Sequence, residues 1–272
     1  MMALVLFLAI GIGLALGLLG GGGSVLAVPV LKYVAGLEAK EALATQLLIV
    51  GTTAGVGAIQ HAIKGNIAVR TGTIFAATAM LGAYLGGLAA VWFSGSTLLI
   101  LFAGMMLVTS VMMFRGRGEL TPREGPIPVG LVMGEGLAVG FFTGLVGAGG
   151  GFMIVPVLVL MGGMPMHRAV GTSLMIMTLK SYSAFLGYVN HVQVDYELAG
   201  YVTLSAVFGT IIGAHYSQRI NAPTLRKGFA WFVLSMAAFV LSQEANIWVA
   251  ASVIVPAAAW MAYQTAQQRK AA

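Results

Sequence analysis

The sequence has no cysteine and very little charge, since only 8% of its 272 residues are Asp, Glu, Lys or Arg. The absence of cysteine excludes disulfide bonds, thiolate metal ligands and thiol redox chemistry. A soluble domain carries about 25% charged residues, which help to cover its water-exposed surface. Because this chain has so few of them and is 59% hydrophobic, its composition excludes an ordinary soluble fold and favours one embedded in a membrane.

Motifs for catalysis and nucleotide binding are also missing. The chain contains no HExxH zinc motif, no serine elbow and no phosphate loop ending in GKS or GKT. We therefore expect no enzyme activity, no cofactor and no metal, and ATP-driven transport would need a separate partner. The net charge of +6 is not taken as a nucleic-acid surface, because Lys and Arg in a membrane protein first report its orientation.

Long apolar stretches recur along the whole chain. Thr97–Phe114 runs 18 residues without a charge and Ile247–Tyr263 runs 17, close to the ~20 residues that a helix needs to cross a bilayer. The pattern predicts an all-α polytopic membrane protein, in which two long broken elements are each followed by three membrane spans. The expected segments are 3–35, 42–61, 71–93 and 97–114, then 129–162, 169–190, 198–218 and 225–242, with an extra C-terminal span at 246–264.

An internal repeat relates the two sets of segments. At an offset of 127 residues, Gly13–Leu31 aligns with Gly140–Leu158, and ten of these nineteen positions are identical. The same ungapped register aligns Gly82–Gly87 with Gly209–Ala214 further along the chain. The polar stretch Arg115–Pro128 is the expected linker between two related halves. The expected domains are a first repeat, a second repeat and an extra helix with a basic tail, at residues 1–122, 123–245 and 246–272.

Charge placement indicates how each broken element lies in the membrane. If each element crossed once, the two sides would carry five and eight Lys or Arg residues. If each one enters and leaves on the same side, eleven fall together and only Lys32 and Lys40 lie opposite, which fits the positive-inside rule far better. We therefore expect re-entrant hairpins and two inverted repeats. Two short full spans in place of each hairpin would also give an odd number of net crossings per half, so the repeats would still be inverted.

The glycines of the broken elements form the candidate site. Paired breaks in inverted halves indicate a transport site, and each restarting helix would present unpaired N–H groups and partial positive charge to an anion. The alternative is that the glycines only let helices pack closely. The residues are Gly20, Gly21, Gly22, Gly23 and Ser24 in the first half and Gly147, Gly149, Gly150 and Gly151 in the second.

Polar residues within the spans complete this candidate site. Thr45 and Gln46 begin one span, and Thr172 and Ser173 occupy the matching place in the other half. Their side chains either bind an oxyanion or bond to their own helix. Lys180 lies some ten residues from either end of its span, and a lysine at that depth indicates a function by default. We expect it to supply positive charge to an anion pathway. The alternatives are that Lys180 forms a structural pair with another residue, or that the span is shifted so that Lys180 lies near its edge.

The histidines and Glu135 are the other ionisable residues near the spans. His61 and His191 lie at span ends, where an amphipathic ring is common, and His215 follows a glycine-rich stretch. Glu135 lies early in the second broken element, where an interfacial position is expected. A coupling proton or ion is left open. A proton-coupling role for any of the histidines is the alternative, and the alternative for Glu135 is a coupling carboxylate.

The two broken segments and the run Ala169–Ser173 resemble the TauE/SafE family of membrane permeases, also called sulfite exporters. The segments read GLLGGGGSVLAVPVL and GLVGAGGGFMIVPVL, and the similarity covers nearly the whole chain. The resemblance implies transport of a small sulfur-containing anion, such as sulfite, thiosulfate or an organosulfonate, across a bacterial inner membrane. It also implies that the glycine breaks, Thr45, Thr172 and Ser173 form the site. Gln46 departs from the pattern, because the second half has a serine in its place.

These features together predict a secondary transporter that works by alternating access in a multi-pass protein of the bacterial inner membrane. Its expected partners are the small anion and the lipid bilayer, with no nucleic acid. An anion channel is the other transport hypothesis, and a structural membrane subunit or an intramembrane enzyme are the alternatives without transport. The anion, the direction of transport and the oligomeric state are left open by the sequence.

Overall fold

The fold is entirely helical over the part of the chain that the structure, a computed structural model, describes. This part comprises residues 2–115, 129–217, 219–245, 251–252, 254–259 and 261. The expected all-α class is thus confirmed for these residues. Most of the expected linker Arg115–Pro128 and much of the expected span 246–264 lie outside them.

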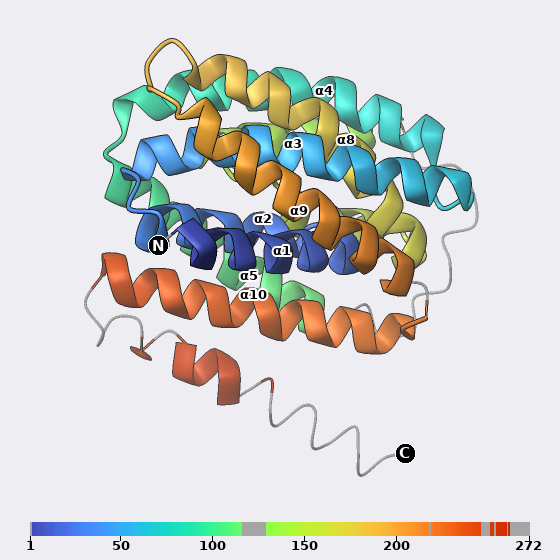
Figure 1. Ribbon diagram of the computed structural model, residues 1–272. Coiled ribbons are helices and arrows are strands. Elements are labelled where there is room, and N and C mark those ends of the chain that lie inside the picture. The colour runs from blue at the N-terminus through green and yellow to red at the C-terminus, as the bar shows by residue number, and fades with distance from the viewer. Residues whose placement is uncertain are drawn as a thin grey trace.

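The helices follow the expected segments closely (Figure 1). Those of the first half are α1 (Met2–Leu19), α2 (Gly22–Pro29), α3 (Ala39–Ile63), α4 (Val69–Ala89) and α5 (Gly95–Arg115). Those of the second half are α6 (Val129–Leu145), α7 (Gly151–Pro156), α8 (Met166–Tyr188), α9 (Tyr196–Ser217) and α10 (Ala222–Glu244). Each half therefore begins with two short or interrupted helices and continues with three long ones.

Among the described helices, six are long and apolar enough to cross a membrane, namely α1, α3, α4 with its extension to Trp92, α5, α9 and α10. By length and composition, the chain is a multi-pass membrane protein. Helix α8 is as long, with 23 residues, but it carries Lys180 and several hydroxyl side chains. Lys180 and the hydroxyl residues Thr172, Ser173 and Ser181 are buried, so they are shielded from lipid.

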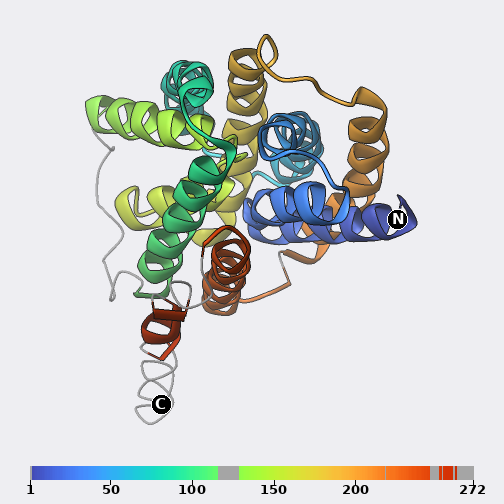
Figure 2. The same cartoon turned by 90° about the vertical axis from the view of Figure 1, so that its left-hand side faces the viewer.

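The centre of the bundle is formed by α3 and α8, which pack against each other. Helix α3 is the most buried of the six candidate spans, because 72% of its most apolar stretch lies inside the protein. Figure 2 shows the first helix of each half, α1 and α6, on opposite sides of this centre. The chain therefore places corresponding elements of its two halves around a shared pair of central helices.

Each expected broken element is interrupted at its glycines and changes again after its proline. Helix α1 ends at Leu19 and α6 at Leu145, and the glycines that follow, Gly20 and Gly147, have φ values of 67° and 56°. Glycine adopts this left-handed region without the steric cost of a Cβ. After the proline of each second arm the backbone widens into a π-helical turn. These turns are Val30–Val34 and Val157–Met161.

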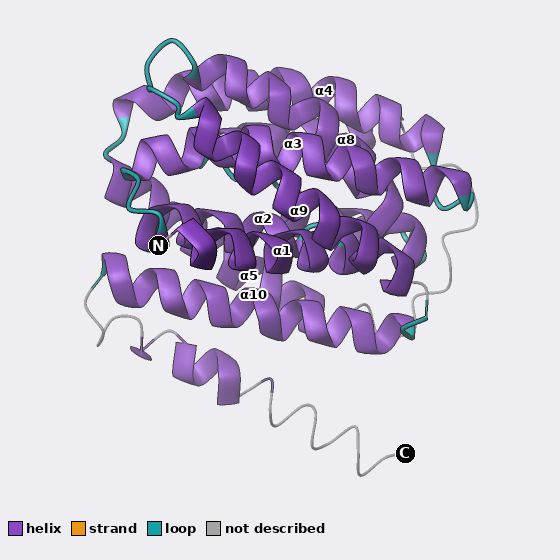
Figure 3. Cartoon of the chain, in the orientation of Figure 1, coloured by secondary structure: helices purple, strands orange, loops and turns teal. Residues whose placement is uncertain are grey.

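The first broken element folds back on itself. Met2 near its start and Leu37 just past its end line the same pocket. Helix α2 packs along α1, and a Cβ at Gly23 would lie 2.2 Å from the carbonyl oxygen of Ile12. The two arms therefore form a hairpin whose start and end lie at one end of the bundle, joined to α3 by a short loop (Figure 3).

Glycines also let the first helix of each half pack closely against the other half. A Cβ at Gly13 of α1 would lie 1.7 Å from a carbonyl oxygen of α9, and one at Gly17 would lie 2.5 Å from another. A Cβ at Gly140 or Gly144 of α6 would lie 2.3 Å from carbonyl oxygens of α4. Small residues at such contacts allow backbones to approach in a membrane. The repeat offset of 127 relates these two contacts, so α1 packs on α9 as α6 packs on α4.

Candidate substrate site at two facing glycine breaks

The two glycine breaks touch each other inside the bundle. A Cβ at Gly21 would lie 2.1 Å from the carbonyl carbon of Gly151, and a Cβ at Gly151 would lie 2.4 Å from the Cα of Gly21. The residues of both breaks, Gly20–Ser24 and Gly147–Gly151, are buried. The structure therefore brings together two segments that lie 127 residues apart in the sequence, and it leaves no room for a side chain between them.

Lys180 of α8 lies beside the second break and is fully buried. Its Nζ donates to the hydroxyl of Thr143 at 2.8 Å and to the carbonyl of Ala148 at 3.3 Å. A Cβ at Gly150, whose φ is 76°, would lie 2.5 Å from this Nζ. Glycine at this position thus gives the ammonium group direct access to the backbone of the break.

The positive charge of Lys180 has no negative partner among the residues that the structure describes. Both of its hydrogen-bond partners are uncharged, and the ion pair found in the described part, Lys32 with Glu244, is formed by other elements. Burying an unpaired charge costs several kcal/mol, and the cost is greater at membrane depth. A bound anion would supply the missing negative charge.

Polar side chains of the central helices hold the backbone carbonyls of the breaks. Ser173 of α8 donates through Oγ to the carbonyl of Gly20 at 2.7 Å. Gln46 of α3 donates through Nε2 to the carbonyl of Gly147. The two donors are equivalent at the repeat offset, and so are the two acceptors. Gln46, which departs from the expected serine, therefore makes the same kind of contact as Ser173, and each central helix holds the break of the other half.

The remaining candidate residues lie in different surroundings. Ser24 donates through Oγ to the carbonyl of Gly21 at 2.7 Å, within the first break. Thr172 accepts a hydrogen bond from the N–H of Ala68 at 2.9 Å and donates to its own helix, so it faces the α3–α4 turn. Thr45 is buried, and its hydroxyl has no partner in the described part of the chain. Gly22 packs against Leu19, Gly23 packs against Leu16, and Gly149 packs against Val50.

Two residues at the second break were not expected from the sequence. Thr143 accepts the hydrogen bond from Lys180. Tyr188 is 2% exposed, and its hydroxyl donates to the carbonyl of Leu145, the last residue of α6, at 2.7 Å. Their signal in the sequence is a departure from the repeat, since Thr143 aligns with Leu16 and Tyr188 with His61. Such departures indicate where the two halves have different roles.

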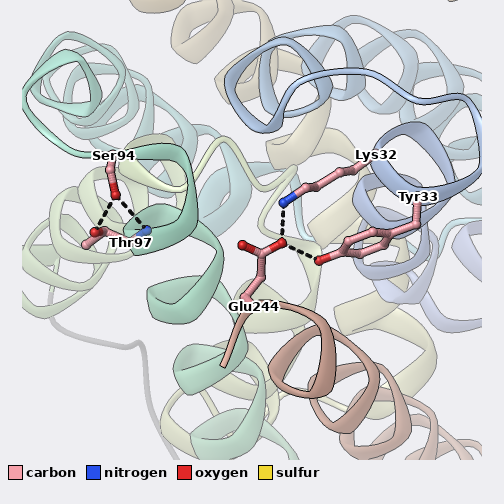
Figure 4. Close-up of polar contacts among 5 residues, drawn as sticks. All are labelled: Lys32, Tyr33, Ser94, Thr97 and Glu244. Carbon is pink, nitrogen blue, oxygen red and sulfur yellow. Dashed lines mark hydrogen bonds and ion pairs between the residues drawn. The ribbon is translucent and has the colours of Figure 1, made fainter. Parts of the chain in front are cut away.

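A charged cluster fixes the end of the first hairpin to α10 (Figure 4). Lys32 and Tyr33, both on the π-helical turn, donate to the Oε1 atom of Glu244, the tyrosine at 2.8 Å. The Glu244 side chain is 6% exposed and that of Lys32 is 20% exposed, so the pair is only partly solvated. The second half has no counterpart, because apolar residues align with Lys32 and Tyr33, namely Val159 and Leu160.

We expect Lys32→Met to destabilise the protein more than Tyr33→Phe does. The lysine change leaves a nearly buried carboxylate without its counter-charge and should cost about 1–3 kcal/mol. The tyrosine change removes one neutral donor and should cost about 1 kcal/mol. Thermal unfolding in detergent measures both. In a double-mutant cycle with Glu244→Gln, the Lys32→Met effect should shrink, whereas strictly additive effects would contradict a coupled pair.

The geometry of facing breaks and a buried lysine can be compared with known proteins. A family model for the sulfite exporter TauE/SafE matches residues 5–240. The chain belongs to this family. A "probable membrane transporter protein" of Xylella fastidiosa is 35% identical over 85% of the chain and 91% of its own length. The "probable membrane transporter protein YdhB" of Bacillus subtilis is 25% identical over 82% and 92% of the two chains.

A further relative from Haemophilus influenzae, also named a probable membrane transporter protein, is 29% identical over 83% of the chain and 92% of its own length. No solved structure matches the chain closely enough to show a relationship. The family and these relatives identify a membrane transporter. A transporter of this family takes a small-molecule substrate and works in a lipid bilayer, which is consistent with the expectation that the chain is not an enzyme.

Proposed function

We propose that this TauE/SafE family member is a secondary carrier for a small sulfur-containing anion, such as sulfite, thiosulfate or an organosulfonate, in a bacterial inner membrane. The observation that carries the proposal is the buried ammonium group of Lys180 at the second break, which is bonded only to uncharged groups. The sulfur chemistry of the anion is taken from the family's description as a sulfite exporter.

Backbone groups of the breaks are suited to the same ligand. The second arms, Gly22–Val34 and Gly151–Leu160, both begin at a break, and the first N–H groups of a helix have no partner within it. Such N–H groups and the helix dipole favour an anion. An oxyanion between the breaks would receive N–H donors from both arms and a charge-assisted bond from Lys180.

We propose that the two halves, 1–122 and 123–245, are inverted repeats with re-entrant hairpins. Two paired observations support this: α1 packs on α9 as α6 packs on α4, and Ser173 holds one break as Gln46 holds the other. The order of contacts along these helices makes α1 parallel to α9 and α6 parallel to α4. Inverted repeats commonly support alternating access around a central site.

A carrier fits the packing of the breaks better than a channel does. Gly21 and Gly151 are in contact, so an anion can enter between the breaks only when they move apart. Such a movement on one side at a time is the essential step of alternating access. A channel would need a continuous polar path through the breaks, and their close packing in this conformation argues against one.

Transport currents on solid-supported membranes test the proposal, with sulfite, thiosulfate, sulfate and isethionate as probes. We expect at least one anion to give a current that saturates with concentration, and the same anion to raise the unfolding temperature, because a ligand that binds only the folded state stabilises it. Absence of both effects for all four anions would contradict the proposed function. A flux that rises linearly without saturation would indicate a channel instead.

A further inference from the structure

His61, at the C-terminal end of α3, is a buried imidazole without a partner. It is 1% exposed, and neither of its ring nitrogens has a hydrogen-bond partner among the described residues. An imidazole offers at least one donor, and it offers an acceptor as well when neutral. Buried polar groups in proteins are nearly always paired. A histidine that remains unpaired in a closed conformation therefore indicates a group that binds something during the working cycle.

The position of His61 places it next to the first glycine break. The ring faces the backbone of Gly17 on α1, three residues before Gly20, in a weak contact that falls short of the geometry of a full hydrogen bond. On its other side, a Cβ at Gly171 of α8 would lie 2.9 Å from the Cβ of His61. Two residues further along α8, Ser173 holds the carbonyl of Gly20. His61 thus lies between the α3–α4 turn and the first break.

The repeat gives His61 a structural counterpart in Tyr188. The two residues align at the offset of 127, both are buried, and each lies against the last turn of the first helix of a hairpin. Tyr188 closes its end with a hydrogen bond to Leu145 at 2.7 Å. His61 occupies the same place without such a bond. One half therefore has a ring whose hydroxyl is already bonded, and the other has an imidazole that can accept a proton.

The charged groups around His61 are all basic. Lys64 on its own element and His167 on α8 are close enough to affect its charge. Helix α1 contains no ionisable side chain, and from α9 the exposed His215 lines an outer groove with Lys64. No described carboxylate acts on His61. A proton on this ring is therefore disfavoured until an anion enters the neighbouring break and supplies negative charge.

We propose that His61 is the binding site of a proton that moves together with the anion. The inference rests on the proposed carrier function and adds its co-substrate. When the pathway opens at the His61 end, the neutral imidazole takes a proton from water as the anion enters the break. When the pathway opens at the other end, the anion and the proton leave together and the imidazole is neutral again. Anion and proton favour each other's binding because the coupling between two sites is reciprocal.

Proteoliposomes loaded with a pH-sensitive dye test the proposal, with sulfate, thiosulfate and isethionate as probes. Sulfite is left out because its neutral acid form crosses bilayers unaided. We expect an inward anion gradient to acidify the lumen of wild-type vesicles when the membrane potential is clamped. The rate of anion uptake should fall by about fivefold or more as the pH rises from 6 to 8, because fewer protons are then available to enter with the anion.

His61→Tyr, which introduces the residue of the other half, and His61→Gln should still exchange labelled anion across the membrane. Both should lose proton movement and most of the pH dependence. His215→Gln, at an exposed histidine, should behave as the wild type. The proposal is overturned if wild-type vesicles move anion without protons, if both His61 variants still move protons, or if proton movement depends on His167 instead. If no anion moves at all in the wild type, the carrier function itself has failed.

Discussion

Lys180→Met should reduce anion transport to background while leaving the protein at least as stable as the wild type. Methionine fills a similar volume in the bundle but carries no charge. Because Lys180 is buried and bonded only to Thr143 and Ala148, its removal relieves a desolvation cost, and unfolding should become harder by an amount on the order of 2 kcal/mol. Loss of transport follows because the anion loses its charge-assisted donor.

This combination of effects distinguishes a binding role from a structural one. If Lys180 instead stabilised the fold through a pairing, Lys180→Met would lower the unfolding temperature together with transport. Lys40→Met provides a matched control, because Lys40 lies at an exposed helix start and donates only to the carbonyl of Val91. The control should keep wild-type currents. Transport by Lys180→Met at wild-type rates would remove Lys180 from the proposed site.

Gly21→Ala should both destabilise the protein and block transport. The added Cβ would lie 2.1 Å from the backbone of Gly151, and backbone cannot move aside as a flexible side chain can. Overpacking of this kind typically costs about 1–3 kcal/mol. The change should also hold the two breaks apart, so that the anion site no longer closes around its ligand. Thermal unfolding in detergent and currents from reconstituted protein measure the two effects.

Gly200→Ala on α9 is the control for this substitution. A Cβ there would meet nothing within 4 Å, and alanine is a better helix former than glycine by about 1 kcal/mol. The control should therefore be as stable as the wild type or slightly more so, with normal currents. If Gly21→Ala matched this control in both measurements, the contact between the breaks would have no functional importance.

The largest features of this protein could be predicted from the sequence because they depend on composition and on local chain chemistry. Low charge and long apolar runs predict membrane helices, and the ends of the expected segments agree with the described helices within a few residues. The helix breaks at Gly20 and Gly147 follow from clustered glycine, which favours left-handed backbone. The position of Lys180 near the middle of its expected span also identified it as a lysine too deep in its helix to reach water.

The partners of these residues could not be predicted, because they depend on how separate helices pack. Ser173 and Gln46 were expected either to bind an oxyanion or to bond to their own helices, and the structure shows them bonded to the carbonyls of Gly20 and Gly147. Thr172 was expected beside them, yet it faces the α3–α4 turn. Each helix presents several faces, and the choice among them is made by the neighbouring helix and not by the residue itself.

The sequence by itself thus determined that this chain is a duplicated helical membrane protein with two glycine breaks and one deep lysine, since periodicity and residue chemistry act within each segment. Only the tertiary structure decided that Gly21 meets Gly151, that Lys180 lies against Gly150, and that His61 is enclosed without a partner. The physical reason is that contact between distant segments depends on close packing of whole helices, where the absence of a Cβ at one position sets how near two backbones can come.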